Sequence, residues 1–300
     1  MSVRALCAYF KKSRSAYYKA EKQHYKTISK QCFITRQVSA HRAVHPYMGG
    51  RKLMHLLAAD LLQMDIKMGR DKFFDLLRKQ GLLVRRPRKY ASTTQSRHYF
   101  RVYKNLIWGW KPSATEQLWV SDITYLRTSG GFVYLFLITD AYSRKVVGWH
   151  LSRSLAIEGA VKALRMALKQ CSSTQGLIHH SDRGIQYCCK AYLRILKKHA
   201  IKISMTEGGD CYQNALAERV NGILKQEYCL DNTFADHTSA KKATLSAIRL
   251  YNKHRPHLSL NMQTPCRIHE KQPELINILT WKLKEKRSKK ENYNSNNSVY

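Results

Sequence analysis

The sequence predicts a mixed α/β protein: a basic helical segment followed by a domain in which helices pack on a mixed sheet. Apolar residues recur at helical spacing through residues 51–80, whereas the short apolar runs typical of strands begin at residue 118. The expected order from there is three strands joined by short turns, then helix, strand, helix, strand and two helices. Strands joined by short turns run antiparallel and strands joined through helices run parallel, so the sheet is mixed.

The first part of the chain is expected to be helical. Residues 1–45 are basic and rich in tyrosine. Residues 46–84 carry two amphipathic stretches, 51–62 and 70–80, and Gly81 suits the end of the second helix. Two short basic helices with a short link favour a helix-turn-helix module that binds DNA. The alternative is a helical hairpin whose basic face is solvated.

Residues 113–270 form the expected core domain. It lies between a basic linker at 85–112 and a basic tail at 271–300, which is rich in Lys, Asn and Ser and expected to be disordered. The run 132–140 is almost entirely apolar, which is typical of a central strand buried on both faces. The expected strands lie at 118–127, 132–140, 144–151, 176–180 and 201–205, and the expected helices at 157–170, 187–199, 214–228 and 235–254.

The chain is strongly basic, with 53 Lys and Arg against 20 Asp and Glu and a net charge of +33. Residues 1–112 carry +20 of that charge. Such a chain repels itself unless it meets a polyanion, so we expect a nucleic acid as the partner. A membrane surface is disfavoured, because the sequence has no amphipathic anchor, no apolar run of spanning length and no secretory signal. We therefore expect a cytoplasmic protein.

The eight cysteines form neither a disulfide framework nor a zinc pattern. No Cys-x-x-Cys occurs. His41 and His45 are spaced like two zinc ligands on a helix, but no cysteine pair follows them. Reduced, mostly buried thiols are expected.

Three acidic residues are candidates for a functional site. Asp122 lies in the middle of the first expected strand, Asp182 just past the end of the fourth, and Glu218 inside the helix that begins near Asn214. The carboxyl ends of strands are where open α/β sheets place their sites. Each acid taken alone is also compatible with an ordinary solvated or capping residue, so the argument depends on the three together.

Four ordered motifs carry a resemblance to a known family. They are Trp119-x-x-Asp-x-Thr-Tyr125, His180-Ser-Asp-x-Gly-x-Gln-Tyr187, Asn214-Ala-x-x-Glu218 followed by Leu224-Lys-x-Glu227, and Tyr251-Asn-x-x-Arg-Pro-His-x-Ser-Leu260 followed by Thr264-Pro265. Over about residues 40–270 the chain resembles the DDE transposases and retroviral integrases, and most closely the second-reading-frame protein of bacterial insertion sequences with an integrase-like core. One position departs from the family: Gln213 replaces the usual aspartate before Asn-Ala, and Asp210 stands three residues earlier.

The resemblance implies an RNase H-like fold in which Asp122, Asp182 and Glu218 are the catalytic residues and the ligands of two Mg²⁺ or Mn²⁺ ions. The chemistry suits carboxylates. Two ions about 3.5–4 Å apart clamp the attacking and leaving oxygens of a phosphodiester. Mg²⁺ prefers hard oxygen ligands and keeps positions open for substrate oxygens. A bridging role for Asp122 is implied by the family alone.

Further residues near the acids are candidates for DNA contact. Lys225 follows Glu218 by seven residues and shares its helix face, so we expect it to contact phosphate; the alternative is a surface lysine. Arg183 is either a phosphate contact or an ion-pair partner. His179 and His180 offer nitrogen donors that suit Mg²⁺ poorly, and they are expected to pack and hydrogen-bond.

Other basic residues extend the expected DNA-binding surface into the N-terminal module and the linker: Arg51, Lys52, Arg70, Lys72, Arg85, Arg86, Arg88 and Lys89. The residues expected to support the site are Thr124, Tyr125, Asn214, Asn252 and Arg255. The first two either orient Asp122 or line the DNA path, and the last two tie the final helix to the core.

The expected function is that of a transposase that cleaves the 3′ ends of its own insertion sequence and joins them to target DNA. Hydrolysis and strand transfer are both in-line phosphoryl transfers, so one site serves both. The expected partner is double-stranded DNA, on which the chain assembles as a homo-oligomer at the nucleoid. Two alternatives stay open: an RNase H-like nuclease without strand transfer, and a DNA-binding subunit that is inactive unless fused to an upstream-frame product.

Overall fold

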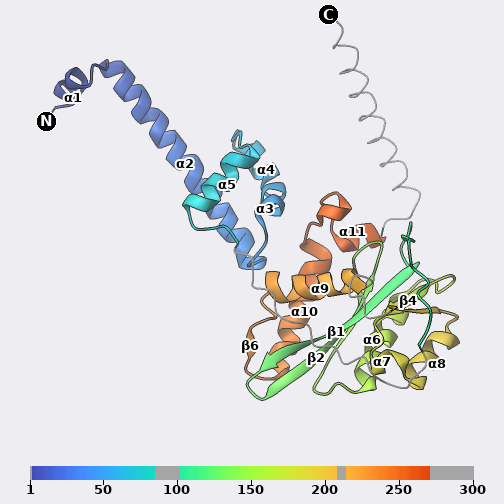
Figure 1. The fold of residues 1–300 in the computed structure, drawn as a ribbon. Helices are drawn as coiled ribbons and strands as arrows, with labels where there is room; N and C mark the ends of the chain where they lie inside the picture. Colours follow the sequence, from blue (N-terminus) through green and yellow to red (C-terminus); the bar gives the residue numbers. More distant parts are fainter. Residues whose placement is uncertain (1, 85–101, 208–213, 271–300) are drawn as a thin grey trace, which may run out of the picture. The chain divides into compact units, whose positions relative to one another are not determined.

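The computed structural model describes residues 2–84, 102–207 and 214–270, which fall into two compact units divided near Arg88 (Figure 1). The expectations for residues 85–101 and for the tail at 271–300 lie outside the described residues, as do those for Asp210 and Gln213. None of the described helices is both long and apolar enough to cross a membrane.

The N-terminal unit is helical. It contains α1 (Val3–Tyr9), α2 (Arg14–Val44), α3 (Gly50–Leu56), α4 (Ala58–Gln63) and α5 (Arg70–Lys79). Ser13 begins α2, because its side chain accepts a hydrogen bond from the N–H of Ala16 (3.0 Å). Gly81 adopts φ +65° just after α5, a backbone conformation that glycine reaches without steric cost. The unit's core joins the C-terminal part of α2 to the three short helices through Ile34, Val38, Leu53, Leu57, Phe73 and Leu77.

The helix expected at 51–62 is broken in two. Leu57 ends α3 and begins α4 with φ −78° and ψ −8°, and its side chain is fully buried in the unit's core. No glycine or proline marks the break in the sequence. Packing of Leu57 has therefore overridden a local pattern that favours one continuous helix.

The second unit contains a mixed sheet in the order β3-β2-β1-β4-β5, with β6 paired to β1. The strands are β1 (Leu118–Thr128), β2 (Gly131–Asp140), β3 (Val146–Ser152), β4 (Ile178–Ser181), β5 (Lys202–Met205) and β6 (Thr233–Phe234). The first three are antiparallel neighbours, whereas β4, β5 and β6 are joined in parallel pairings. The expected α/β fold with an RNase H-like mixed sheet is thereby confirmed.

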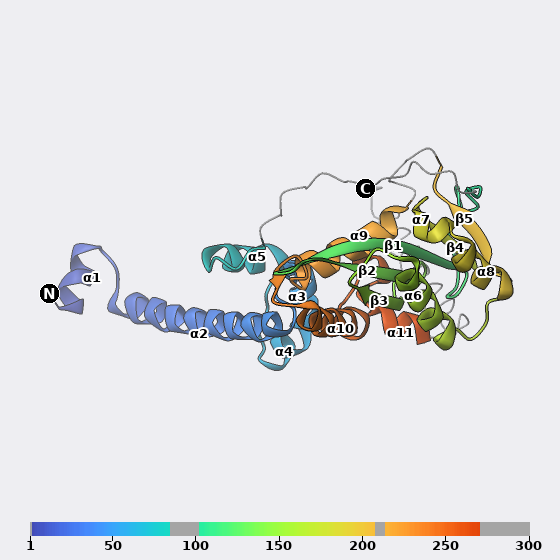
Figure 2. The same cartoon turned by 90° about the horizontal axis from the view of Figure 1, so that it is seen from below.

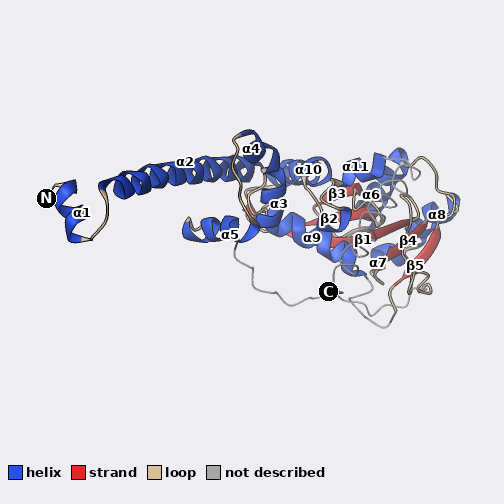
Figure 3. Cartoon of the chain, turned by 90° about the horizontal axis from the view of Figure 1, so that it is seen from above, coloured by secondary structure: helices blue, strands red, loops and turns tan. Residues whose placement is uncertain are grey.

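Helices cover both faces of this sheet (Figures 2 and 3). Helices α6 (Ile157–Gln170), α7 (Ile185–Cys188) and α8 (Lys190–Lys198) pack on one face, and α9 (Ala215–Glu227) and α10 (His237–His254) pack on the other. Phe136 and Ile138 of β2 enter the first core, whereas Leu135 and Leu137 enter the second. Because successive side chains of a strand point to opposite faces, burial on both sides explains why this segment is almost entirely apolar.

Helix α6 approaches the sheet closely where glycine allows it. A Cβ atom added at Gly159 would lie 2.3 Å from the ring of Phe136. The sequence placed α6 correctly, but the helix expected at 187–199 is divided at Cys189, whose backbone is extended (φ −69°, ψ 140°). Strand β6, the 3₁₀ turn η2 (Leu258–Leu260) and helix α11 (Pro265–Glu270) had no counterpart among the expected elements.

Candidate active site

Two of the three candidate carboxylates lie side by side because of strand register. Strands β1 and β4 are parallel, and Ser121 of β1 pairs with Ser181 of β4, the last residue of that strand. Asp122 directly follows Ser121 in the sequence, and Asp182 directly follows Ser181. Neighbouring strands lie about 4.8 Å apart, so the backbones of Asp122 and Asp182 are close to each other.

Asp122 is held by two hydrogen bonds. Its Oδ1 accepts from the N–H of Ile123 (2.9 Å), and its Oδ2 accepts from Nδ2 of Asn221 on α9 (2.8 Å). Burial is the largest cause that raises the pKa of Asp122 to about 7. The charges of Asp182 and Glu218 also raise it, and the two hydrogen bonds act to lower it.

Glu218 projects from the first turn of α9 and is exposed. Its pKa is raised by partial burial and by the charge of Asp182. It borders a surface hollow of about 440 Å³ on α9, which Arg219, Gly222 and Gln226 also line. Beside Gly222 this surface is open.

The three carboxylates suit a hard divalent cation because they offer oxygen ligands and because a cation would relieve the repulsion between their negative charges. Asp182 raises the pKa of both Asp122 and Glu218, while Glu218 also raises that of Asp122. In the described part of the chain, however, no three His, Cys, Asp or Glu side chains are close enough together to form a ready ion site. A cation shared by all three would therefore need them to approach further, a movement that their repulsion opposes until positive charge is present.

Asp182 shapes its own turn. Its Oδ1 accepts from the N–H of Gly184 (3.0 Å), and a Cβ added at Gly184 would lie 3.0 Å from that same oxygen. Arg183 directs its Nε to the carbonyl oxygen of Thr206 (2.7 Å), which ties the residue after Asp182 to the end of β5.

Lys225 lies against the sheet rather than in bulk solvent. Its Nζ is 4.4 Å from the ring centroid of Tyr125, a cation–π contact. Its pKa is lowered by burial, while Asp231 and Asp122 act to raise it. Tyr125 itself is exposed and meets Phe132 edge to face, with ring centroids 5.1 Å apart.

The expected supporting residues join α9 and α10 to the sheet. Asn214 donates from Nδ2 to the carbonyl of Ser121 (3.0 Å), one residue before Asp122. Asn252 of α10 accepts from the N–H of Val146 (2.9 Å) and donates to its carbonyl (3.0 Å). Thr124 lies two residues along β1 from Asp122, which puts it on the same face of the sheet.

Arg255 connects the segment after α10 to the end of α9. It is buried and donates from Nε and Nη2 to the two carboxylate oxygens of Glu227, each at 2.7 Å. A bidentate pair of this geometry fixes both partners.

The two histidines of β4 are internal, as expected. Nε2 of His179 lies 2.7 Å from the hydroxyl of Ser121 and 2.9 Å from that of Tyr192. Burial, with His180 adding to it, lowers the pKa of His179 to about 3, so the ring stays neutral. Nδ1 of His180 lies 2.8 Å from the hydroxyl of Ser204.

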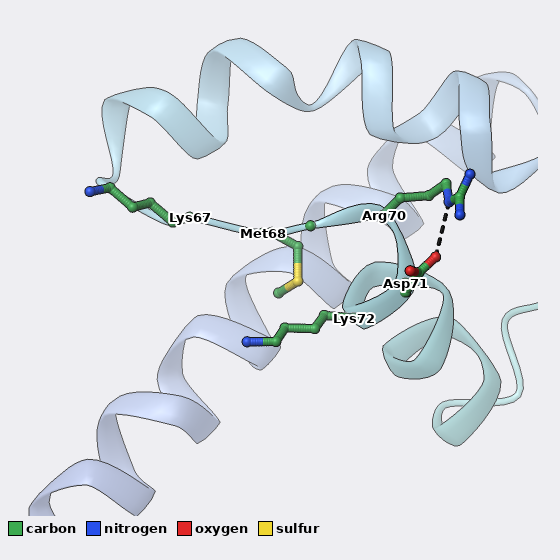
Figure 4. A pocket seen from close by; sticks show the side chains of 6 residues that line it. Lys67, Met68, Arg70, Asp71 and Lys72 are labelled. Atoms are coloured by element: carbon green, nitrogen blue, oxygen red, sulfur yellow. Dashed lines mark hydrogen bonds and ion pairs between the residues drawn. The ribbon is translucent and has the colours of Figure 1, made fainter. Parts of the chain in front are cut away.

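The N-terminal candidates for DNA contact differ in their placement. Arg51, Arg70 and Lys72 are exposed, and the last two line a shallow pocket with Lys67 at the start of α5 (Figure 4). Lys52 is only 8% exposed, so its side chain is withdrawn from the surface that DNA would meet, contrary to expectation. Arg85, Arg86, Arg88 and Lys89 lie outside the described residues.

Asn221 was missed by the sequence analysis. It is 5% exposed and provides the side-chain donor to Asp122. A signal existed, because residues three apart on a helix share a face and Asn221 follows Glu218 by three.

Comparisons with known proteins identify the family of the chain. A family model described as "Integrase core domain" matches residues 112–211, and a second with the same description matches residues 199–265. The transposase InsF for insertion sequence IS3fB of Escherichia coli (strain K12) is 31% identical over 258 residues, which cover 85% of this chain and 90% of that protein. The uncharacterized 31 kDa protein of insertion element IS600 from Shigella sonnei is 34% identical over 271 residues, covering 89% of this chain and 98% of the relative.

Among solved structures, the catalytic core domain of HTLV-2 integrase in complex with magnesium matches 52% of this chain and 98% of its own, with 19% identity and a TM-score of 0.42. The match covers nearly the whole length of both insertion-sequence relatives, so it is not limited to the integrase core. The chain therefore belongs to the IS3-family transposases of insertion sequences, polynucleotidyl transferases with an integrase core domain.

Proposed function

We propose that Asp122, Asp182 and Glu218 are the catalytic carboxylates of this transposase and bind Mg²⁺ or Mn²⁺, as two ions, during 3′-end cleavage and strand transfer. The observation that carries the proposal is the pairing of Ser121 with Ser181, which sets Asp122 and Asp182 next to each other where β4 ends. The electrostatic influence of Glu218 on Asp122 supports its place in the same site.

The protein's contribution is positioning. Asn221 and the N–H of Ile123 orient the two oxygens of Asp122, while Gly184 orients one oxygen of Asp182. When bound by these carboxylates, divalent ions supply charge stabilisation at the scissile phosphate and activate the attacking oxygen. Water or a 3′-hydroxyl then serves as nucleophile in the same in-line geometry, so neither step needs a covalent bond to the protein.

The proposed DNA contacts are basic residues near the carboxylates and in the N-terminal unit. Lys225 and Arg183 are the proposed phosphate contacts next to the carboxylates, and Arg51, Arg70 and Lys72 are proposed contacts in the helix-turn-helix module. We place the active form on double-stranded DNA at the nucleoid as a homo-oligomer. An upstream-frame product is a proposed further partner.

The test is a cleavage and joining assay on DNA that carries the element's ends, with the wild-type chain and with Asp122→Asn, Asp182→Asn and Glu218→Gln. Each variant should lose cleavage by orders of magnitude while retaining DNA binding, because a neutral isostere keeps the shape of the side chain and loses its charge. Glu158→Gln is the matched control, since Glu158 is an exposed acid on α6, across the sheet from α9. If one of the three site variants cleaves as well as this control, the residue changed in that variant is not a catalytic carboxylate.

The wild-type products also separate the alternatives. Cleaved ends without joined products would indicate a nuclease. Binding without cleavage would indicate a subunit that requires fusion to an upstream-frame product.

A further inference from the structure

Helix α2 has a long stretch that its own unit leaves uncovered. Between Arg14 and Lys30 every residue except Glu21 is exposed, and the buried residues of the helix, Ile34 and Val38, lie in its C-terminal half. Figure 1 shows α1 at one end of α2 and the three short helices packed at the other. Most of the stability of helices in proteins comes from tertiary packing, so the exposed part is expected to gain stability from a partner.

One face of this stretch is a lysine stripe, made of Lys19, Lys22, Lys26 and Lys30. The steps of three, four and four residues bring all four side chains within a narrow sector of the helix, because each residue turns it by about 100°. All four are exposed. The stripe is about 16 Å long, from 11 residues at about 1.5 Å each.

The stripe lacks acidic neighbours along the helix. Glu21 is the single acidic residue among the 31 residues of α2, and it is not three or four positions from any of the four lysines. The lysines are instead spaced three or four residues from one another, an arrangement that destabilises a free helix. A polyanion along this face would reverse that repulsion.

We propose that the lysine stripe of α2 is a binding surface for the phosphate backbone of duplex DNA, separate from the helix-turn-helix helices and from the catalytic carboxylates. The inference rests on the proposed action of the chain on DNA and extends it to an element without an assigned role. At about 3.4 Å per phosphate along one strand, a stripe of this length passes about five phosphates, enough to give each lysine its own. A second copy of this chain is the less suitable occupant, because two such stripes would repel each other.

The experiment measures how the affinity of the full chain for a short duplex of arbitrary sequence depends on salt, by fluorescence anisotropy in EDTA so that no cleavage occurs. The stripe variant carries Lys19→Gln, Lys22→Gln, Lys26→Gln and Lys30→Gln. Glutamine has nearly the helix propensity of lysine, and circular dichroism checks that helix content is kept. The assay measures binding alone, so a failure here is independent of the three-carboxylate proposal.

A matched control removes the same charge from another part of the chain. It carries glutamine at four exposed lysines of α8 and β5: Lys190, Lys197, Lys198 and Lys202. The log–log salt slope of the stripe variant should be shallower by about 3 to 4, since each phosphate contact contributes about 0.9. Between about 50 and 200 mM salt, the wild-type affinity should therefore fall roughly 100-fold more than that of the variant, while the control keeps the wild-type slope.

Two further measurements decide how the result is understood. Arginine at the four stripe positions retains the charge and should retain the wild-type slope; a shallower slope there would overturn the electrostatic explanation. Equal slopes for the stripe variant and the wild type would overturn the proposal itself. A DNA-free dimer in sedimentation velocity, strengthened by the glutamine substitutions, would assign the stripe to a second copy and would also overturn it.

Discussion

The hydrogen bond from Asn221 to Asp122 gives a direct test of how the active site is held. Asn221→Ala removes the donor that lies 2.8 Å from Oδ2 of Asp122 and leaves the N–H of Ile123 on the other oxygen. Alanine is the best helix former, so α9 should persist. Asp122 would then lose the group that fixes its orientation toward Asp182.

The size of the effect follows from the partner's charge. A hydrogen bond to an ionised group contributes about 1.5–3 kcal/mol. In a metal-binding equilibrium this corresponds to roughly a 10- to 150-fold weaker affinity. We expect the Mg²⁺ concentration that gives half-maximal cleavage to rise by about that factor, with a smaller change in the rate at saturating Mg²⁺.

The assay is a Mg²⁺ titration of end cleavage, with Asn252→Ala as the control. Asn252 is also buried on a helix and makes two hydrogen bonds, but to the backbone of Val146. Its loss should lower the midpoint of thermal unfolding and leave the Mg²⁺ requirement unchanged at temperatures where the protein is folded. An unchanged Mg²⁺ midpoint for Asn221→Ala would refute the proposed positioning of Asp122.

Three other predictions follow from the same contacts. Lys225→Ala should raise the DNA concentration for half-maximal cleavage, and Lys225→Glu should raise it further by repelling phosphate; unchanged kinetics for both would make the residue an ordinary surface lysine beside Tyr125. Mn²⁺ should replace Mg²⁺ in the cleavage assay, whereas Ca²⁺ should support binding at most and EDTA should stop cleavage, because Ca²⁺ takes looser coordination; full activity in EDTA would exclude a metal role. Glu227→Ala should destabilise the protein by about 3 kcal/mol in denaturant unfolding, because it leaves Arg255 buried without its carboxylate; a loss below about 1 kcal/mol, the range of an exposed pair, would contradict this.

The sequence by itself determined the class of fold and the family. The almost continuous apolar run of β2 marked a strand buried on both faces, because alternate residues such as Leu135 and Phe136 enter different cores. The spacing of Asp122, Asp182 and Glu218 within ordered motifs pointed to the transposases, since local patterns and motif order are written directly in the chain.

The tertiary structure decided which side chains meet. The pairing of Ser121 with Ser181 depends on how β1 and β4 register, and register is set by packing of the whole sheet. The same holds for Asn221, which reaches Asp122 across 99 positions of sequence. Burial of Lys52 and the break at Leu57 likewise depend on neighbours distant along the chain. Local propensities extend over a few residues, whereas these contacts are chosen by long-range packing, so only the folded chain reveals them.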